Sequence, residues 1–103
     1  MSRLEKIFRQ DEANIPLFKN HDEAKAWFIN RYKNSFVLTN FSVINEKKCY
    51  FYTLVLDPEV YNDGIKKLKS TKTLLGFEFL YSYQSIEIYE DGNIHIVHQP
   101  FLP

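Results

Sequence analysis

The chain has 103 residues with 13 basic and 13 acidic side chains, so its formal net charge is zero. Hydrophobic residues make up 45% and charged residues 25%, which is typical of a globular domain and excludes a disordered chain. The length fits one domain, and the balanced charge lacks the basic excess of dedicated nucleic-acid-binding domains.

Cysteine content and hydropathy indicate the compartment. Cys49 is the single cysteine, so no internal disulfide can form. Charges interrupt the first nine residues, and no apolar run reaches the roughly 18 residues of a membrane-spanning helix. We therefore expect a cytoplasmic protein. The abundance of Phe, Tyr, Ile, Asn and Lys, which have AT-rich codons, indicates a low-GC bacterium or its mobile elements.

The first twenty residues are expected to form a short helix and a loop. Ser2 and Glu5 have the spacing of a capping box, and apolar residues follow at helical spacing. The stretch 10–20 holds Pro16 and predicts a loop before the next helix.

The clearest helical pattern predicts a helix over 21–34. Asn20 can cap its first turn, and Glu23 stands at the reciprocal position of a capping box. Trp27 lies in the middle of the apolar stripe, so we expect it to anchor the core. The stripe consists of Ala24, Trp27, Phe28 and Tyr32.

From residue 36 the apolar period changes to two, which predicts two antiparallel strands joined by a polar turn at 45–48. The expected register pairs Val43 with Tyr50 and Phe41 with Tyr52, because one face of the hairpin then becomes apolar. The opposite face is mixed and carries Phe36, Leu38 and Phe51.

A second main helix is predicted to begin at Asp57-Pro58, with the aspartate as cap and the proline at the first helical position. A basic run follows in its C-terminal half and just beyond, made of Lys66, Lys67, Lys69 and Lys72.

Residues 77–83 alternate between aromatic and other side chains, which predicts a strand. The apolar parity then changes, so we expect a bulge at 84–85. A three-residue turn at 91–93, with positive φ at Gly92 or Asn93, would pair Ile88 with Ile96. One face would then collect Ile86, Ile88, Ile94 and Ile96.

Together these elements predict a single α+β domain over 1–103. It would have an antiparallel sheet of four to five strands in hairpins, with two main helices packed on one face. The expected order is (α)αββαβββ. Residues 99–103 form a Pro-rich tail that is expected to stay outside the sheet.

The sequence lacks the usual signatures of catalytic and metal sites. His95 and His98 would point to opposite faces of a strand, and no clustered cysteines and histidines have the spacing of a zinc site. Cys49 stands between strand residues and predicts a structural thiol. The glycines are isolated, so no phosphate-binding loop is indicated. We therefore expect no enzyme, no metal and no cofactor.

The aromatic content of 17% is the unusual feature of the chain. Aromatic residues could fill a small core or form a binding face, since tyrosine is enriched at protein interfaces. We expect a protein-binding domain, such as an adaptor, inhibitor or immunity-type protein, whose partner is another protein or a second copy. The candidate residues are Phe36, Leu38, Phe51, Tyr81 and Tyr83, with Lys47 and Lys48 as a polar rim.

The alternative function is binding of RNA or single-stranded DNA. It would combine the basic run with tyrosines exposed on the sheet, on which bases can stack. The candidate residues for this function are Lys66, Lys67, Lys69 and Lys72.

Overall fold

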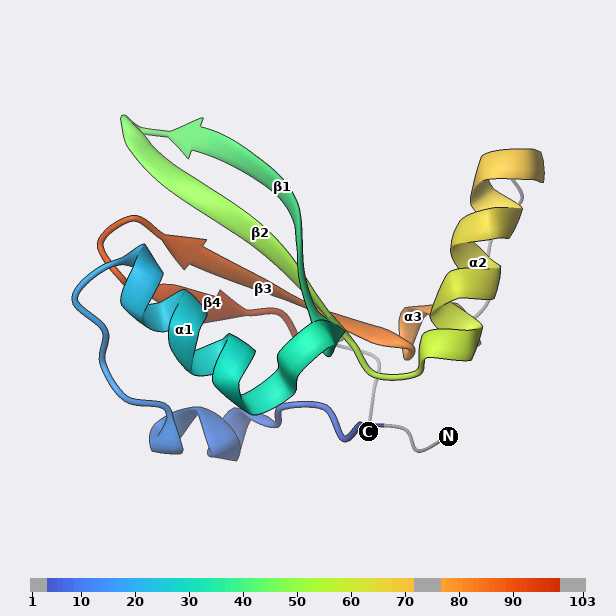
Figure 1. The fold of residues 1–103 in the computed structure, drawn as a ribbon, viewed down its shortest axis with the longest axis horizontal. Coiled ribbons are helices and arrows are strands. Elements are labelled where there is room, and N and C mark those ends of the chain that lie inside the picture. Colours follow the sequence, from blue (N-terminus) through green and yellow to red (C-terminus); the bar gives the residue numbers. More distant parts are fainter. Residues whose placement is uncertain (1–3, 72–76, 99–103) are drawn as a thin grey trace.

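A four-stranded antiparallel sheet forms the centre of the protein (Figure 1). The computed structural model describes residues 4–71 and 77–98. The strands lie side by side in chain order: β1 (Phe36–Ile44), β2 (Lys47–Val55), β3 (Tyr83–Tyr89) and β4 (Ile94–Ile96). The helices are η1 (Arg9–Asn14), α1 (His21–Tyr32), η2 (Lys33–Ser35), α2 (Pro58–Thr71) and α3 (Phe77–Leu80), where η marks a 3-10 helix. The predicted α+β class is confirmed.

The N-terminal segment differs from its prediction. Residues 4–8 are not helical, and helical structure begins only with η1. The backbone N–H of Leu4 donates to the Leu56 carbonyl at 2.8 Å, and the Ile7 N–H donates to Gln84 Oε1 at 2.9 Å. These distant partners replace the hydrogen bonds that a local helix would have made. Ser2 and the tail 99–103 lie outside the described residues.

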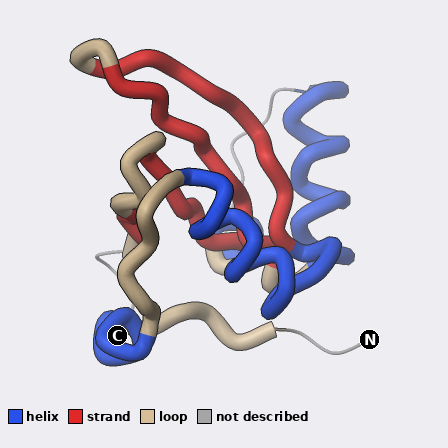
Figure 2. The backbone as a smooth tube through the Cα atoms, turned by 60° about the vertical axis from the view of Figure 1, so that its left-hand side comes forward, coloured by secondary structure: helices blue, strands red, loops and turns tan. Residues whose placement is uncertain are grey.

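Helix α1 forms where the sequence predicts it. Asn20 Oδ1 accepts from the Glu23 N–H at 2.9 Å, and Glu23 Oε1 accepts from the Lys19 N–H at 3.1 Å. The helix ends two residues early, at Tyr32, because Lys33 takes a positive φ of 54°. Figure 2 shows α1 lying against one face of the sheet.

The anchor of α1 is Phe28 and not Trp27, so that prediction was wrong. Phe28 is fully buried, whereas Trp27 is only partly buried and meets Phe28 edge-on at 4.9 Å between ring centres. The Arg31 guanidinium lies 5.6 Å from the Trp27 ring centre, so the indole borders solvent.

The first hairpin closes through a two-residue turn, which corrects the expected register. Asn45 and Glu46 have φ of 51° and 68°, as a primed turn requires. Such a turn matches the right-handed twist of the strands. It pairs Phe41 with Tyr50, where the expected register paired Phe41 with Tyr52.

A bulge in β1 corrects the expected faces of the strand. Thr39 has no cross-strand partner between the pairs Leu38–Tyr52 and Asn40–Phe51. Side chains alternate between the two faces of a strand, and one extra residue shifts this alternation by one position. The odd-numbered residues after the bulge therefore point to the same face as the even-numbered residues before it. Phe36, Leu38, Phe41 and Val43 therefore all lie on the face that α1 covers in part.

Helix α2 starts at Pro58 as predicted, and Asp57 Oδ1 accepts from the Val60 N–H at 3.3 Å. It stands beyond the end of the sheet and not on its face (Figures 1 and 2). The ring of Tyr61 stacks on that of Phe79 in α3 at 5.8 Å. A β-carbon at Gly64 would lie 2.1 Å from Phe79 Cδ1, so the glycine permits this close approach.

Helix α3 occupies part of the stretch for which the sequence predicted a strand over 77–83. The strand prediction fails because Phe79 packs onto α2, and β3 begins only at Tyr83. The parity change needs no bulge at 84–85, where the pairing of β2 with β3 is regular.

The second hairpin brings its four isoleucines to one face, as predicted. The expected pairing of Ile88 with Ile96 is wrong, however, since Ile88 pairs with Ile94 and Ile86 with Ile96. The Tyr89 N–H donates to the Asn93 carbonyl at 2.8 Å, so the three-residue turn consists of residues 90–92 and not 91–93. Gly92 has a φ of 91°, which confirms the expected positive φ. The buried residues of the core are Ile7, Ala24, Phe28, Phe36, Tyr52, Leu54, Leu56, Ile86, Ile88 and Ile96.

Candidate interaction surface

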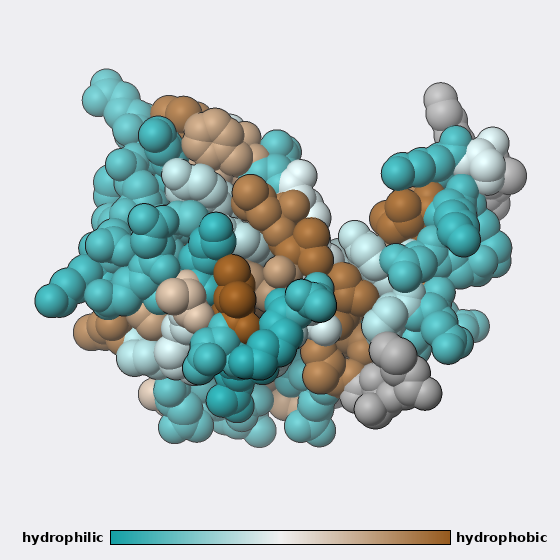
Figure 3. Space-filling model, in the orientation of Figure 1, coloured by the Kyte–Doolittle hydropathy of each residue, from teal (hydrophilic) through white to brown (hydrophobic). Residues whose placement is uncertain are grey.

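Exposed apolar side chains concentrate on β1. Of the eight large apolar residues that are exposed in the described part of the chain, five belong to this strand. They are Val37, Leu38, Phe41, Val43 and Ile44. Figure 3 shows apolar surface beside the hydrophilic tip of the first hairpin. Because scattered exposed apolar residues are normal and clusters are not, β1 is the candidate interaction surface.

Three of these residues form what we call the β1 patch: Leu38, Phe41 and Val43. Their side chains share one face of the sheet and are 51%, 48% and 59% exposed. The strand is an edge of the sheet, and its nine residues include neither a charge nor a proline. Edge strands commonly carry such residues as protection against pairing with another chain. In β1 only the bulge at Thr39 serves this purpose.

The β1 patch is the exposed end of a column of rings that begins in the core. Phe28 stacks on Phe36 at 5.0 Å, and Phe36 stacks on Tyr52 at 4.4 Å. The His21 ring stacks on both Tyr52 and Tyr50, at 5.9 and 3.7 Å, and Tyr50 meets Phe41 at 5.4 Å. A residue bound against Phe41 would therefore rest on a rigid, packed support.

The structure separates the aromatic residues that the sequence proposed for binding. Phe36 is 6% exposed and belongs to the core, so it is not a surface residue. Leu38 is exposed on the face of α1, whereas Phe51 is half-buried on the opposite face. Tyr81 and Tyr83 lie at the other end of the sheet beside a cavity.

The two lysines expected as a polar rim do lie at the tip of the first hairpin. Lys47 Nζ lies 3.0 Å from Asp91 Oδ2, and the Lys48 N–H donates to Glu90 Oε1 at 2.5 Å. These contacts tie the first hairpin to the loop of the second. Lys48 stands opposite Val43, so it borders the β1 patch.

The residues proposed for nucleic-acid binding lie on α2. Lys66, Lys67 and Lys69 are exposed, and Lys67 pairs with Asp63 at 3.1 Å, while Lys72 lies outside the described residues. Tyr50 and Tyr52 lie beside α1 at His21, not on an open face near these lysines. The structure therefore does not bring the basic run and these two strand tyrosines together.

His21 is the centre of a cluster of polar and aromatic side chains that the sequence did not predict. Its Nε2 lies 2.7 Å from the Tyr52 hydroxyl, its Nδ1 lies 3.1 Å from Asp22 Oδ1, and its ring stacks on Tyr50 at 3.7 Å. Burial is the main cause that raises the pKa of Tyr52 to about 12. The hydroxyl is closed off from solvent, since Tyr52 is 3% exposed. The cluster therefore fastens the start of α1 to β2.

The other reactive groups are held in structural contacts. Burial raises the pKa of the Cys49 thiol, so it is protonated at neutral pH and is a weak nucleophile. His95 Nδ1 lies 3.4 Å from Glu87 Oε1, and His98 Nε2 lies 2.5 Å from Glu12 Oε2. No group of three or more metal-ligating side chains occurs within the described ranges.

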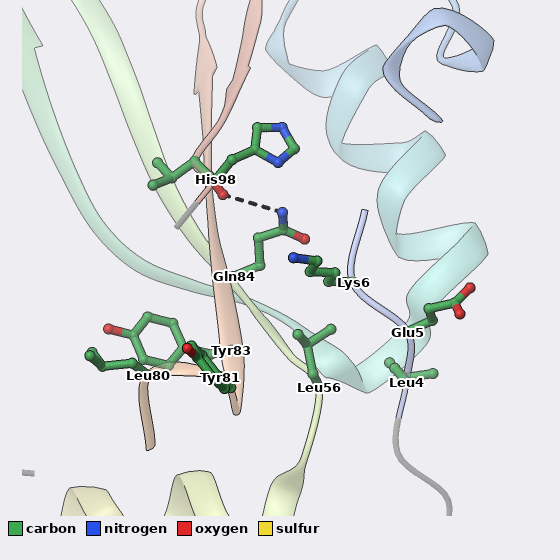
Figure 4. A pocket seen from close by; sticks show the side chains of 10 residues that line it. Leu4, Glu5, Lys6, Leu56, Leu80, Tyr81, Tyr83, Gln84 and His98 are labelled. Carbon is green, nitrogen blue, oxygen red and sulfur yellow. Dashed lines mark hydrogen bonds between the residues drawn. The ribbon is translucent and has the colours of Figure 1, made fainter. Parts of the chain in front are cut away.

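A cavity of about 240 Å³ lies between the N-terminal segment and the start of β3 (Figure 4). Gln84 lies in its wall, and its side-chain amide donates to the carbonyls of Ile7 and Val97 at 3.0 and 3.2 Å. Among the described side chains no buried nitrogen or oxygen lacks a hydrogen-bond partner. No unsatisfied polar group thus points to a ligand in this cavity.

The chain matches no protein-family model, no curated protein sequence and no solved structure. Over residues 4–71 and 77–98, no helix is long and apolar enough to cross a membrane.

Proposed function

We propose that this protein is a small non-enzymatic protein-binding domain that receives its partner along the edge of β1. The supporting observation is the concentration of exposed apolar side chains on an uncharged edge strand. An edge strand offers unpaired backbone groups, and the side chains beside it supply apolar contact area. This proposal keeps Leu38 from the sequence-based candidates and adds Phe41 and Val43.

The orientation of the backbone supports strand addition. In a two-residue hairpin, Ile44 and Lys47 form a hydrogen-bonded pair, and such pairs alternate along the strands. The N–H and C=O groups of Phe41 and Val43 therefore point away from β2. The N–H of Phe41 accordingly donates to Asn40 Oδ1 at 2.8 Å.

An affinity purification from the source cell tests this function. The baits are the wild-type protein, Val43→Lys, and Leu17→Lys as a matched control, because Leu17 is 98% exposed in the loop before α1. We expect a protein that binds the wild type and the control at least tenfold better than Val43→Lys. The captured partner, once purified, should show the same preference for the wild type and Leu17→Lys over Val43→Lys. Equal recovery by all three baits would contradict the proposal.

A further inference from the structure

We infer that the partner of β1 is a second copy of this chain, paired antiparallel along β1 about a two-fold axis at Ser42. This inference rests on the proposed function and adds the identity of the partner. The result would be one continuous eight-stranded sheet, because each copy contributes its four strands.

The absence of charge on β1 favours a second copy. In a two-fold interface the same surface of each copy meets the other, so a strand that carried charges of one sign would repel its copy. All nine residues of β1 are uncharged, in a chain in which 25% of residues are charged. An edge without charge offers nothing to a basic or an acidic partner, whereas it is compatible with itself.

The position of the bulge fixes the register. Regular pairing with β2 extends from Asn40 to Ile44, and Ser42 is the midpoint of this segment. An axis at Ser42 thus pairs the longest regular stretch with itself. Phe41 of one copy then stands opposite Val43 of the other, and both backbones turn their free groups toward the interface.

The side chains fit this register. Within one copy, Phe41 pairs with Tyr50 and Val43 pairs with Lys48. A row of side chains across the interface therefore consists of Tyr50 and Phe41 of one copy, followed by Val43 and Lys48 of the second copy. Aromatic and β-branched residues pair favourably across strands. The two-fold axis produces this row twice, and the lysine charges stay at the outer ends.

The available area indicates a weak dimer. Five half-exposed side chains offer a few hundred Å² of apolar surface per copy. A standard interface buries about 800 Å² per partner, so this dimer belongs to the small class. We therefore expect dissociation constants in the micromolar range or weaker.

The Asn40 side chain competes with the second copy for a backbone hydrogen-bond donor of β1. It occupies the Phe41 N–H, which the second copy would need. Replacing Asn40 by alanine frees this donor and leaves the rest of the strand unchanged. The dimer should then become several-fold tighter, which loss of a purely structural contact would not cause.

Sedimentation equilibrium over about 5–500 µM tests the inference, with circular dichroism to show that each variant is folded. We expect a concentration-dependent dimer for the wild type and Leu17→Lys. Val43→Lys should weaken it at least tenfold, and Asn40→Ala should strengthen it. A monomeric wild type over the whole range, or a dimer unchanged in both Val43→Lys and Asn40→Ala, would overturn the inference.

Disulfide trapping tests the register. Ser42 also stands opposite Cys49, so the variants are made in a Cys49→Ala background. At a non-hydrogen-bonded pair the Cα atoms lie about 4.5 Å apart, which permits a disulfide. Under mild oxidation by diamide, Ser42→Cys should give a covalent dimer. Ile44→Cys should give no covalent dimer, because residue 44 of one copy would stand opposite residue 40 of the other, four residues away from the second cysteine. The reverse pattern would refute the axis at Ser42.

The outcomes separate this inference from the proposed function. A wild type that stays monomeric while Val43→Lys loses an identified, purified partner overturns the dimer and supports the broader protein-binding function. A monomeric wild type with no partner affected by Val43→Lys overturns both.

Discussion

Phe36 and Phe41 are the same residue type on one strand and one face of the sheet, yet they are 6% and 48% exposed. Phe36 lies between the rings of Phe28 and Tyr52, whereas Phe41 meets one ring, that of Tyr50, among residues 4–71 and 77–98. The difference shows that coverage by α1, and not the sequence of β1, divides the strand into a core half and a surface half.

The largest expected effect tests this division directly. Phe36→Ala should reduce the free energy of unfolding by about 3–5 kcal/mol, because it opens a cavity between two packed rings. Phe41→Ala should cost less than about 1.5 kcal/mol, since the ring is already half in water. Urea denaturation at low micromolar concentration measures both. Equal losses would mean that the distal half of β1 is also core.

The next prediction concerns what holds α1 over the core half. A β-carbon at Gly92 would lie 2.4 Å from the Phe18 carbonyl oxygen and 2.9 Å from the Asn20 nitrogen, just before α1. With a φ of 91° as well, Gly92→Ala should cost about 2 kcal/mol or more. Asn93→Ala, in the same loop but exposed, serves as the control in thermal denaturation. Similar melting temperatures for both variants would contradict the close approach.

These two regions also show how far sequence reasoning reaches. The caps at Asn20 and Asp57 and the shared face of Ile86 and Ile88 were predicted, because caps and alternation depend on neighbours in sequence. The bulge at Thr39 was not, since inserting one residue leaves an acceptable pattern in either register.

Helix α3 and the interaction surface depend on packing between distant segments. A sequence that alternates Phe77, Phe79 and Tyr81 indicates a strand, and only contact with Gly64 and Tyr61 makes the helical turn favourable. Phe41 is exposed because α1 begins beside Tyr50, where His21 stacks on that ring, and does not extend over Phe41 on the neighbouring strand. No local signal distinguished it from Phe36.

A third prediction uses the contact at the boundary between the two halves. Tyr52 has a pKa of about 12 in the folded protein, against about 10 when unfolded. Because the raised pKa keeps the folded state protonated, this contribution to stability is complete below pH 10 and is lost as pH rises toward 12. The loss should be at most about 3 kcal/mol, because each pKa unit corresponds to about 1.4 kcal/mol.

Comparing the wild type with Tyr52→Phe isolates this effect from the other tyrosines. The variant lacks the hydroxyl that lies 2.7 Å from His21 Nε2, so it should be less stable at neutral pH by about 1 kcal/mol. Because the loss expected for the wild type exceeds this difference, its advantage over Tyr52→Phe should shrink above pH 10 and reverse as the pH approaches 12. A constant difference over that range in urea denaturation would show that the Tyr52 hydroxyl titrates normally.

The smallest expected effect concerns salt, and it distinguishes the uncharged end of β1 from the lysines of α2. Association through β1 involves no charged residue of that strand, so raising salt from about 50 to about 200 mM should change its dissociation constant less than about twofold. Binding of a single-stranded nucleic acid through three lysines would weaken roughly 20-fold over the same range, because each phosphate contact releases a counterion. Fluorescence anisotropy measures both dissociation constants. Labelled protein is titrated with unlabelled protein for self-association, and labelled single-stranded RNA is titrated with unlabelled protein for RNA binding. A steep salt dependence of self-association would place charged residues in the interface and contradict pairing through β1.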